Sequence, residues 1–278
     1  MKGDWDQFFL KQTGRSSGDN SCVLPYLLHL ADNSLILAHR NSEWCGHGPV
    51  LEQDIALANI ALDLLGQARN FYQYAADLFN QKTEPGINAA PITEDSLAYL
   101  REAKDFKNCL LAEQPNGDWG KTILRQFLFS TFQYYLYMQL QKIKDERIAA
   151  IAEKALKEVT YHVRWSSEWV IRLGDGTEES HQRMSNALAD LWPCVAELFK
   201  PATYESGCVK IGMAADLQII EPLWHQKILE TLKKATLLLP LAQPAPGYSG
   251  KEGLHTKHLF ELLNEMQFLQ RTYPGCEW

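Results

Sequence analysis

The stretch from Leu51 to Phe79, LEQDIALANIALDLLGQARNFYQYAADLF, has the pattern of one uninterrupted helix of about eight turns. One seam repeats at spacings of four and three, as in a helix that faces a partner helix, and consists of Leu51, Ile55, Ala58, Leu62, Leu65, Arg69, Tyr72, Ala76 and Phe79. A second apolar row, spaced by seven, consists of Leu57, Leu64, Phe71 and Leu78. We expect the seam to pack within its own bundle and the second row to meet neighbouring subunits.

The remainder of the chain carries helical patterns and almost no strand signals. Further helices are expected at about 22–44, 106–112, 119–144, 147–173, 177–199, 222–238 and 256–273, with an ordered loop at 200–215. Two long hairpins joined by one crossover of about forty residues are typical of the ferritin-like bundle. The predicted fold is therefore all-α, a ferritin-like helical bundle with one long crossover and extra C-terminal helices.

Composition limits the class of protein. A chain of 278 residues with 46% hydrophobic content is large enough to bury a sizeable core. Residues 1–20 are polar and are expected to form an N-terminal extension, and residues 21–278 a single ferritin-like helical domain. The six cysteines show no CxxC spacing and are expected to be small reduced hydrophobic residues.

Charge and hydropathy argue against two classes of partner. The net charge is −7 and no Lys/Arg run appears, so nucleic acid is not an expected partner. No stretch approaches the roughly 18 consecutive apolar residues of a membrane span, and the first residues lack the apolar core of a signal peptide. The chain is expected to be cytoplasmic, with no membrane partner.

The predicted bundle raises the question of a di-iron centre. Such a centre needs one Glu from each of two helices and Glu-x-x-His from each of the other two. The segment between Lys121 and Lys144 contains no Asp or Glu, and the 51–79 helix contains no His. We therefore expect this chain to bind no metal, with Glu43, Asp63, Glu158 and His162 as candidates for a vestigial site.

Two alternatives use the same fold. Irregular ligands drawn from these four candidate residues would make the chain a self-sufficient metal-carboxylate oxidase. An iron-storage shell needs carboxylate-rich inner surfaces, against which the 119–144 helix argues. In the structural interpretation His162 is a hydrogen-bonded core histidine, Asp63 pairs with another helix, and Arg69 is a partnered interior or interface cation. His255 is expected to cap a helix or anchor a loop.

Several long motifs resemble one family. SEWCGHGP (42–49), LDLLGQARNF (62–71), EQPNGDW (113–119), KEVTYHVR (157–164) and KEGLHTKHLFELLNEMQFLQR (251–271) occur in this order. They are similar to the PaaC family, the C subunits of the bacterial phenylacetyl-CoA 1,2-epoxidase (ring-hydroxylating monooxygenase) complex. The resemblance runs from about Leu30 to Trp278.

This resemblance implies a noncatalytic structural subunit that stabilises a homologous catalytic subunit, PaaA, in aerobic phenylacetate catabolism. The chain itself would bind no cofactor. The di-iron centre that epoxidises phenylacetyl-CoA would lie in PaaA, and NADPH, FAD and an iron–sulfur cluster in a separate reductase component. Further copies of this chain and the other subunits of the complex are the remaining candidate partners.

The CoA tail of such a substrate is long and anionic, so it is expected to extend over a partner's surface. Candidate contacts are Asp105, Phe106, Lys107 and Asn108 on the crossover, and Ser206, Gly207 and Cys208 between Lys200 and Lys210. The alternative interpretation is that the crossover residues are ordinary solvated residues.

Overall fold

The structure, a computed structural model, describes residues 21–82, 91–241, 247–274 and 276. Within these ranges the chain contains helices and no strand, apart from an isolated bridge between Ser249 and Leu254. The all-α prediction is confirmed. No helix in the described ranges is long and apolar enough to cross a membrane. The predicted N-terminal extension, residues 1–20, lies outside the described residues.

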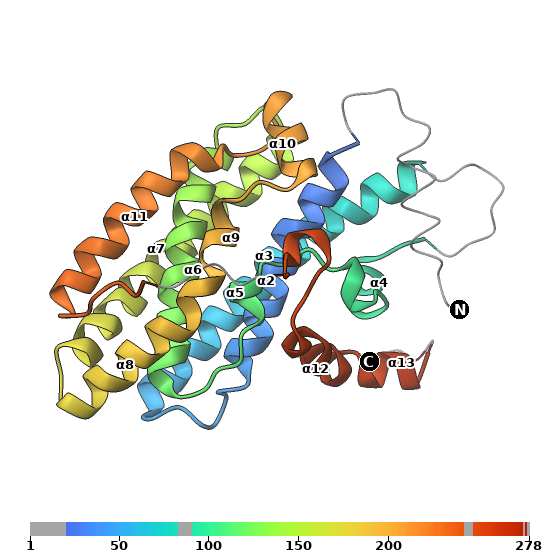
Figure 1. Cartoon of the computed structure of the whole chain (residues 1–278). Helices are drawn as coiled ribbons and strands as arrows, with labels where there is room; N and C mark the ends of the chain where they lie inside the picture. Colours follow the sequence, from blue (N-terminus) through green and yellow to red (C-terminus); the bar gives the residue numbers. More distant parts are fainter. Residues whose placement is uncertain (1–20, 83–90, 242–246, 275, 277–278) are drawn as a thin grey trace.

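Four long helices form the bundle (Figure 1). The first hairpin pairs α2 (Val23–Ser42) with α3 (Leu51–Lys82), and the second pairs α6 (Trp119–Leu140) with α7 (Glu146–Gly174). Both helices of the second hairpin begin at N-capping residues. The Asp118 carboxylate accepts the Lys121 N–H at 2.9 Å at the start of α6, and the Asp145 carboxylate accepts the Ile148 N–H at 2.9 Å at the start of α7. The two hairpins meet where α3 packs beside α7, which gives the predicted ferritin-like arrangement.

The crossover between the hairpins carries α4 (Glu94–Tyr99), a 3₁₀ turn η1 (Ala103–Asp105) and α5 (Leu110–Glu113). The expected helix at 106–112 is wrong in its first half, because Phe106 and Cys109 have extended backbones. Side chains of α2 account for this difference. The Lys107 N–H donates to Asp32 at 2.7 Å and the Cys109 N–H to Asn33 at 2.8 Å, so neither is available to a helix.

The C-terminal third of the chain lies outside the four-helix bundle. Its elements are α8 (Glu178–Leu191), η2 (Trp192–Cys194), α9 (Ala196–Phe199), α10 (Thr203–Lys210), α11 (Leu217–Lys234), η3 (Gly250–Glu252), α12 (Lys257–Met266) and α13 (Phe268–Thr272). The expected loop at 200–215 is wrong, since α10 lies within it. The expected start of α11 at Pro222 is also wrong. Asp216 caps this helix by accepting the Gln218 N–H at 2.9 Å, so the helix begins five residues earlier.

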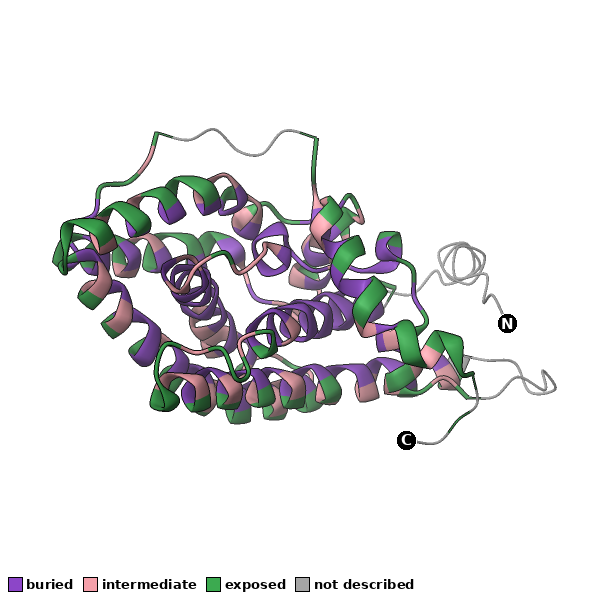
Figure 2. Cartoon of the chain, turned by 90° about the horizontal axis from the view of Figure 1, so that it is seen from below, coloured by how far each residue is buried: buried purple, intermediate pink, exposed green. Residues whose placement is uncertain are grey.

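In the first half of α3 the environments of the two apolar rows differ from those expected. Leu57, Leu64 and Phe71 are 0% exposed and belong to the chain's own core. In the seam, by contrast, Leu51 and Leu62 are 72% and 64% exposed. The assignment of the second row to neighbouring subunits is therefore wrong. Figure 2 shows the general pattern, in which the buried sides of the long helices face one another and the exposed sides face outward.

The seam becomes buried toward the end of α3. Tyr72, Ala76 and Phe79 are at most 5% exposed, in the half of α3 against which α4 packs. Arg69 lies between the two halves, with its side chain 69% exposed and its Nε 3.3 Å from a Glu94 oxygen. Arg69 is therefore partnered, as predicted, but it is not an interior cation of this chain.

Candidate functional site

The bundle interior, where a ferritin-like protein would hold metal, contains two polar pairs between α3 and α7. The His162 Nε2 lies 2.9 Å from an Asp63 oxygen, and the Gln67 amide donates to Glu158 at 3.0 Å. The two pairs are one helical turn apart on antiparallel helices. The His162 side chain is 0% exposed, whereas 36% of the Asp63 side chain is exposed. The predictions of a core histidine and of an interhelical partner for Asp63 are confirmed.

A layer of amide and hydroxyl groups continues from Gln67 across the interior. The Tyr137 hydroxyl donates to the Gln67 side-chain oxygen at 3.1 Å, and the Gln133 amide lies 3.4 Å from that hydroxyl. Ser34 of α2 also hydrogen-bonds Tyr137. Burial raises the pKa of Tyr137, so its phenol stays protonated and acts as a donor. We call Ser34, Gln67, Gln133, Tyr137 and Glu158 the interior polar layer.

This donor set does not fit a di-iron centre. Such a centre takes about four carboxylates and two imidazoles, whereas the interior polar layer offers a single carboxylate, Glu158. The His162 Nε2 already faces Asp63. In residues 21–82, 91–241, 247–274 and 276, no three His, Cys, Asp or Glu side chains gather closely enough to hold a metal ion.

The remaining vestigial-site candidate, Glu43, has other partners. Its two carboxylate oxygens bind Arg40 and Asn116, each at 2.7 Å, just beyond the last turn of α2. The structure thus brings Asp63, Glu158 and His162 onto the α3–α7 contact and gives Glu43 a separate role in joining α2 to the turn before α6.

A buried ion pair fastens the crossover to the bundle. Asp32 of α2 pairs with both terminal nitrogens of Arg101, and both side chains are 0% exposed. The same carboxylate accepts the Tyr72 hydroxyl at 2.5 Å. Burial alone would lower the pKa of the Arg101 guanidinium, but the charge of Asp32 outweighs burial and raises it. The charged pair is therefore well satisfied, which a buried ion pair requires to be stable.

A second buried network fastens the C-terminal segment to the crossover. Glu113 of α5 lies 2.7 Å from the His255 Nδ1 and accepts the Thr256 N–H, also at 2.7 Å. The other ring nitrogen of His255 lies 3.0 Å from the Phe106 carbonyl oxygen. Burial would lower the pKa of His255, but Glu113 outweighs it and raises the pKa above its ordinary value of 6.5. The prediction that His255 anchors a loop is confirmed.

The predicted CoA contacts on the crossover have mainly internal partners. Asp105, Phe106 and Asn108 are buried. The Phe106 ring lies 4.2 Å below the Arg101 guanidinium, and the Asn108 amide donates to Glu113 at 2.9 Å. Lys107 is half-buried, and burial lowers the pKa of its amine. The side chain that is most available to a ligand in this segment is therefore Lys107.

The second predicted group lies in α10, beside the crossover. The Lys107 Nζ is 5.4 Å from the ring centre of Tyr204, the residue that precedes Glu205 in α10. Ser206 and Gly207 are half-buried, while Cys208 is fully buried against the start of α2. The fold thus brings the two predicted groups together, and CoA contact remains a prediction.

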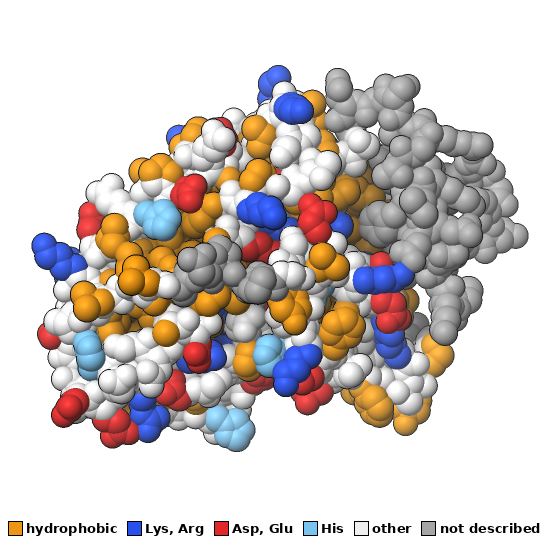
Figure 3. All heavy atoms as spheres, in the orientation of Figure 1, with side chains coloured by type: hydrophobic (Ala, Val, Ile, Leu, Met, Phe, Trp, Pro, Cys, Tyr) orange, Lys and Arg blue, Asp and Glu red, His pale blue; other side chains and the backbone are white. Residues whose placement is uncertain are grey.

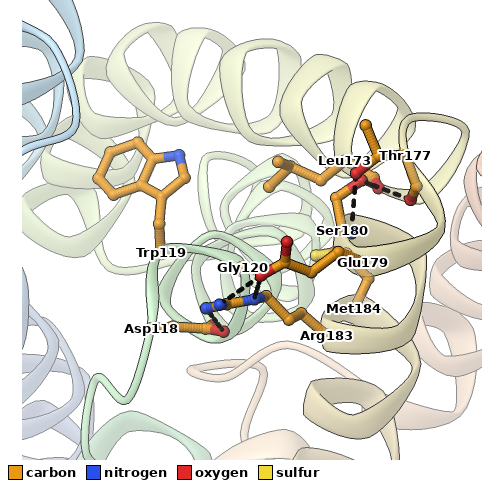
Figure 4. A pocket seen from close by; sticks show the side chains of 9 residues that line it. All are labelled: Asp118, Trp119, Gly120, Leu173, Thr177, Glu179, Ser180, Arg183 and Met184. Atoms are coloured by element: carbon orange, nitrogen blue, oxygen red, sulfur yellow. Dashed lines mark hydrogen bonds and ion pairs between the residues drawn. The ribbon is translucent and has the colours of Figure 1, made fainter.

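A pocket of about 250 Å³ lies outside the bundle interior, where α6 begins and α8 packs against it (Figure 4). Arg183 points toward Asp118 and Glu179, with contacts of 3.5 and 2.7 Å. The Ser180 hydroxyl donates to the Leu173 carbonyl at 2.7 Å. Because these polar groups are satisfied by one another, the pocket has the features of a surface hollow between helices rather than of a reaction site.

The face of the molecule in Figure 3 carries Lys/Arg and Asp/Glu side chains that are interspersed rather than gathered by sign. Apolar side chains gather beside them over α11 and the segment that follows it. The exposed apolar residues there are Ile219, Leu223, Leu229, Leu238, Leu239 and Leu241. Among the described residues, the exposed part of the α3 seam and this surface over α11 are two places where exposed apolar side chains occur together.

Sequence comparisons agree with this architecture. Residues 11–278 match a family described as phenylacetic acid catabolic protein. The chain is 45% identical over 253 residues to the C subunit of 1,2-phenylacetyl-CoA epoxidase from Escherichia coli (strain K12), an alignment that covers 91% of this chain and 98% of that protein. These matches confirm the family resemblance inferred from the motifs. The chain belongs to the family of phenylacetic acid catabolic proteins.

Proposed function

We propose that this chain is a noncatalytic, structural subunit of a multicomponent phenylacetyl-CoA 1,2-epoxidase. The observation that carries this proposal is the interior polar layer. Where an active ferritin-like subunit would hold carboxylates around two metal ions, Gln67, Gln133 and Tyr137 hydrogen-bond one another around Glu158. Amide and phenol groups in this position hold the helices together but do not supply the charge that a di-iron centre needs.

The exposed part of the α3 seam supports a role in assembly. Leu51, Ile55 and Leu62 are 72%, 51% and 64% exposed, on a helix that is otherwise well packed. A groove of about 370 Å³ continues this surface between α3 and α4, where Leu65, Ala68 and Tyr99 contribute to its lining. Contiguous apolar surface of this kind is typical of protein interfaces. We assign it to the homologous catalytic ferritin-like subunit, PaaA.

In this proposal the complex works in the cytoplasm in phenylacetate catabolism. The catalytic subunit holds the di-iron centre, and the reductase component supplies electrons from NADPH through FAD and an iron–sulfur cluster.

Lys107, beside Tyr204, is the residue of this chain that we assign to contact with the CoA tail. A Lys107→Ala variant should weaken acyl-CoA binding by the assembled complex, and unchanged affinity would exclude this contact.

Co-expression with the catalytic subunit tests the structural role. We expect the catalytic subunit to be more soluble and to unfold at a higher temperature when this chain is present. Leu62→Asp should reduce co-purification at least about tenfold, because it places a charge in the proposed apolar interface. The matched control is Leu229→Asp in α11, which adds the same charge at a leucine that is 49% exposed.

Two results would contradict the proposal. If the catalytic subunit is equally soluble and stable without this chain, the chain does not stabilise it. If Leu62→Asp and Leu229→Asp reduce co-purification equally, the α3 seam is not the specific contact surface.

A further inference from the structure

Two cysteines that are far apart in the sequence lie in contact where α10 packs against the start of α2. The Sγ atoms of Cys22 and Cys208 are 2.7 Å apart, across 186 residues of sequence. Cys22 precedes the first residue of α2 and is half-buried, whereas Cys208 in α10 is 0% exposed. Neither thiol belongs to the interior polar layer or to the apolar surfaces described above.

The backbone at this contact allows the close approach. A Cβ atom placed on Gly207 would lie 3.1 Å from the Cys22 Cβ and 3.6 Å from its Sγ. A larger residue at position 207 would therefore push Cys22 away from α10. The glycine before Cys208 permits the sulfur atoms to meet.

Polar contacts near the two cysteines join α2 to α10 and to the segment that follows α10. The backbone N–H of Ala215 donates to the Tyr26 hydroxyl of α2 at 3.4 Å. Glu205 of α10 lies 3.6 Å from the His29 ring of α2 and 3.1 Å from the Lys251 amine. These anchors are one and two turns along α2 from Cys22, so the two sulfur atoms are held at short range without a bond between them.

We propose that Cys22 and Cys208 are the site of a reversible disulfide, formed when the chain meets hydrogen peroxide and opened again by small thiols. The Cys22 thiol reacts with peroxide to give a sulfenic acid and one water molecule. The Cys208 sulfur then attacks the Cys22 sulfur, and the hydroxyl group leaves as a second water molecule. Two thiols lose two electrons and two protons in total, and one peroxide is reduced to two water molecules.

The environments of the two sulfur atoms determine the order of these steps. Burial raises the pKa of the Cys208 thiol, so this residue is a poor first nucleophile toward a dissolved oxidant. Cys22 is the more accessible of the two and meets peroxide first. A sulfenic acid on Cys22 would then find its resolving thiol already in contact.

The bond would tie α10 to the start of α2 and close a loop of 186 residues. Closing so long a loop restricts the unfolded chain strongly. The oxidised chain should therefore unfold at a temperature roughly 5–10 °C higher than the reduced chain. In a reducing compartment the thiol form would predominate, so the disulfide would form only when the chain is exposed to peroxide.

The test uses the full-length chain treated with graded hydrogen peroxide, digested without reduction and analysed by mass spectrometry. A peptide that joins Cys22 to Cys208 should appear in proportion to peroxide and disappear with dithiothreitol. Cys208→Ser should abolish it, while Cys109→Ser, which removes another fully buried thiol, should leave it unchanged. Gly207→Ala should slow its formation severalfold.

The wild-type digest alone decides the proposal, even if a variant folds poorly. Oxidation of Cys22 to sulfinic acid without a link to Cys208 would overturn it. So would a link from Cys22 mainly to Cys45 or Cys276, the two exposed cysteines.

Discussion

The two apolar rows of α3 lie in different environments over the first half of the helix. Leu57, Leu64 and Phe71 are fully buried in the chain's own core, whereas Leu51 and Leu62 are 72% and 64% exposed. Leu62 and Leu64 are two residues apart on one helix, and their side chains point to different sides of it. The second row packs in the core of the chain, and the first part of the seam stays exposed.

The exposed row does not extend along the whole helix. Its continuation, from Tyr72 to Phe79, is buried on the half of α3 against which α4 packs, and the Tyr72 hydroxyl joins the Asp32–Arg101 pair. Packing of the crossover therefore determines the point along α3 at which the seam residues change from exposed to buried. This difference shows that exposure along α3 is set by its neighbours, not by the residues of α3 alone.

The largest effect on stability is expected when the same substitution, leucine to aspartate, is made in each of the two rows and the two variants are compared. Leu64→Asp places a carboxylate in the packed core and should cost at least about 4–5 kcal/mol, because a buried unpaired charge is among the most destabilising changes. Leu62→Asp should change the free energy of unfolding by less than about 0.5 kcal/mol. Urea unfolding followed by circular dichroism measures both.

Similar unfolding midpoints for these two variants would contradict the assignment of the rows. Lost helicity in Leu64→Asp would also exclude the sequence-based expectation that this row serves assembly.

The next largest effect is expected at the buried Asp32–Arg101 ion pair, which contacts the seam at Tyr72. Asp32→Ala leaves the Arg101 guanidinium buried without its carboxylate and should cost about 3–5 kcal/mol. The matched control is Asp77→Ala, which breaks a pair with Arg147 in which both side chains are about half exposed, and should cost at most about 1 kcal/mol. Equal losses of stability in thermal unfolding would show that burial of the first pair has no energetic consequence.

The smallest effect is a pH dependence of the network that holds the C-terminal segment on the crossover. The pKa of His255 is raised above 6.5 in the folded chain by Glu113. Its stabilisation is therefore fully present below pH 6.5 and is lost as the pH rises through the folded pKa. Between about pH 6 and pH 9, His255→Gln should show a smaller decrease in unfolding free energy than the wild-type chain.

His258→Gln provides a control for that experiment. His258 is half-buried and lies 3.3 Å from Glu261, and its replacement leaves the Glu113–His255 contact intact, so the decrease assigned to His255 should remain. An identical dependence in His255→Gln and the wild-type chain would mean that the Glu113–His255 contact does not titrate in this range.

Much of the fold can be predicted from periodicity and chain breaks. Periodicity places the four bundle helices within a few residues of their observed bounds, whereas the helix expected at 177–199 is interrupted by the η2 turn, which contains Pro193. The errors have different causes. Phe106 to Cys109 is extended because α2 side chains bind its backbone, and α10 forms where Glu205 accepts the Ala202 N–H. The first kind of contact joins segments far apart in the sequence and the second is a local helix cap, and neither leaves a periodic pattern in the sequence.

The candidate site is predictable in part. Glu158 and His162 are identified from the sequence as candidates for a vestigial site, and the absence of carboxylates between Lys121 and Lys144 is visible directly. The role of Gln67 escapes the sequence prediction, although its position three residues after Leu64 and four before Phe71 marks a buried polar residue. The pairing of Asp32 with Arg101 escapes it too, because 69 residues separate them and only the folded crossover brings them together.

The most direct test of the central claim is the iron content of the purified full-length chain, expressed alone in iron-supplemented medium and measured by plasma mass spectrometry. The interior polar layer around Glu158 offers one carboxylate, so we predict well below about one iron per folded chain. About two irons per chain, the content of a di-iron centre, would contradict it.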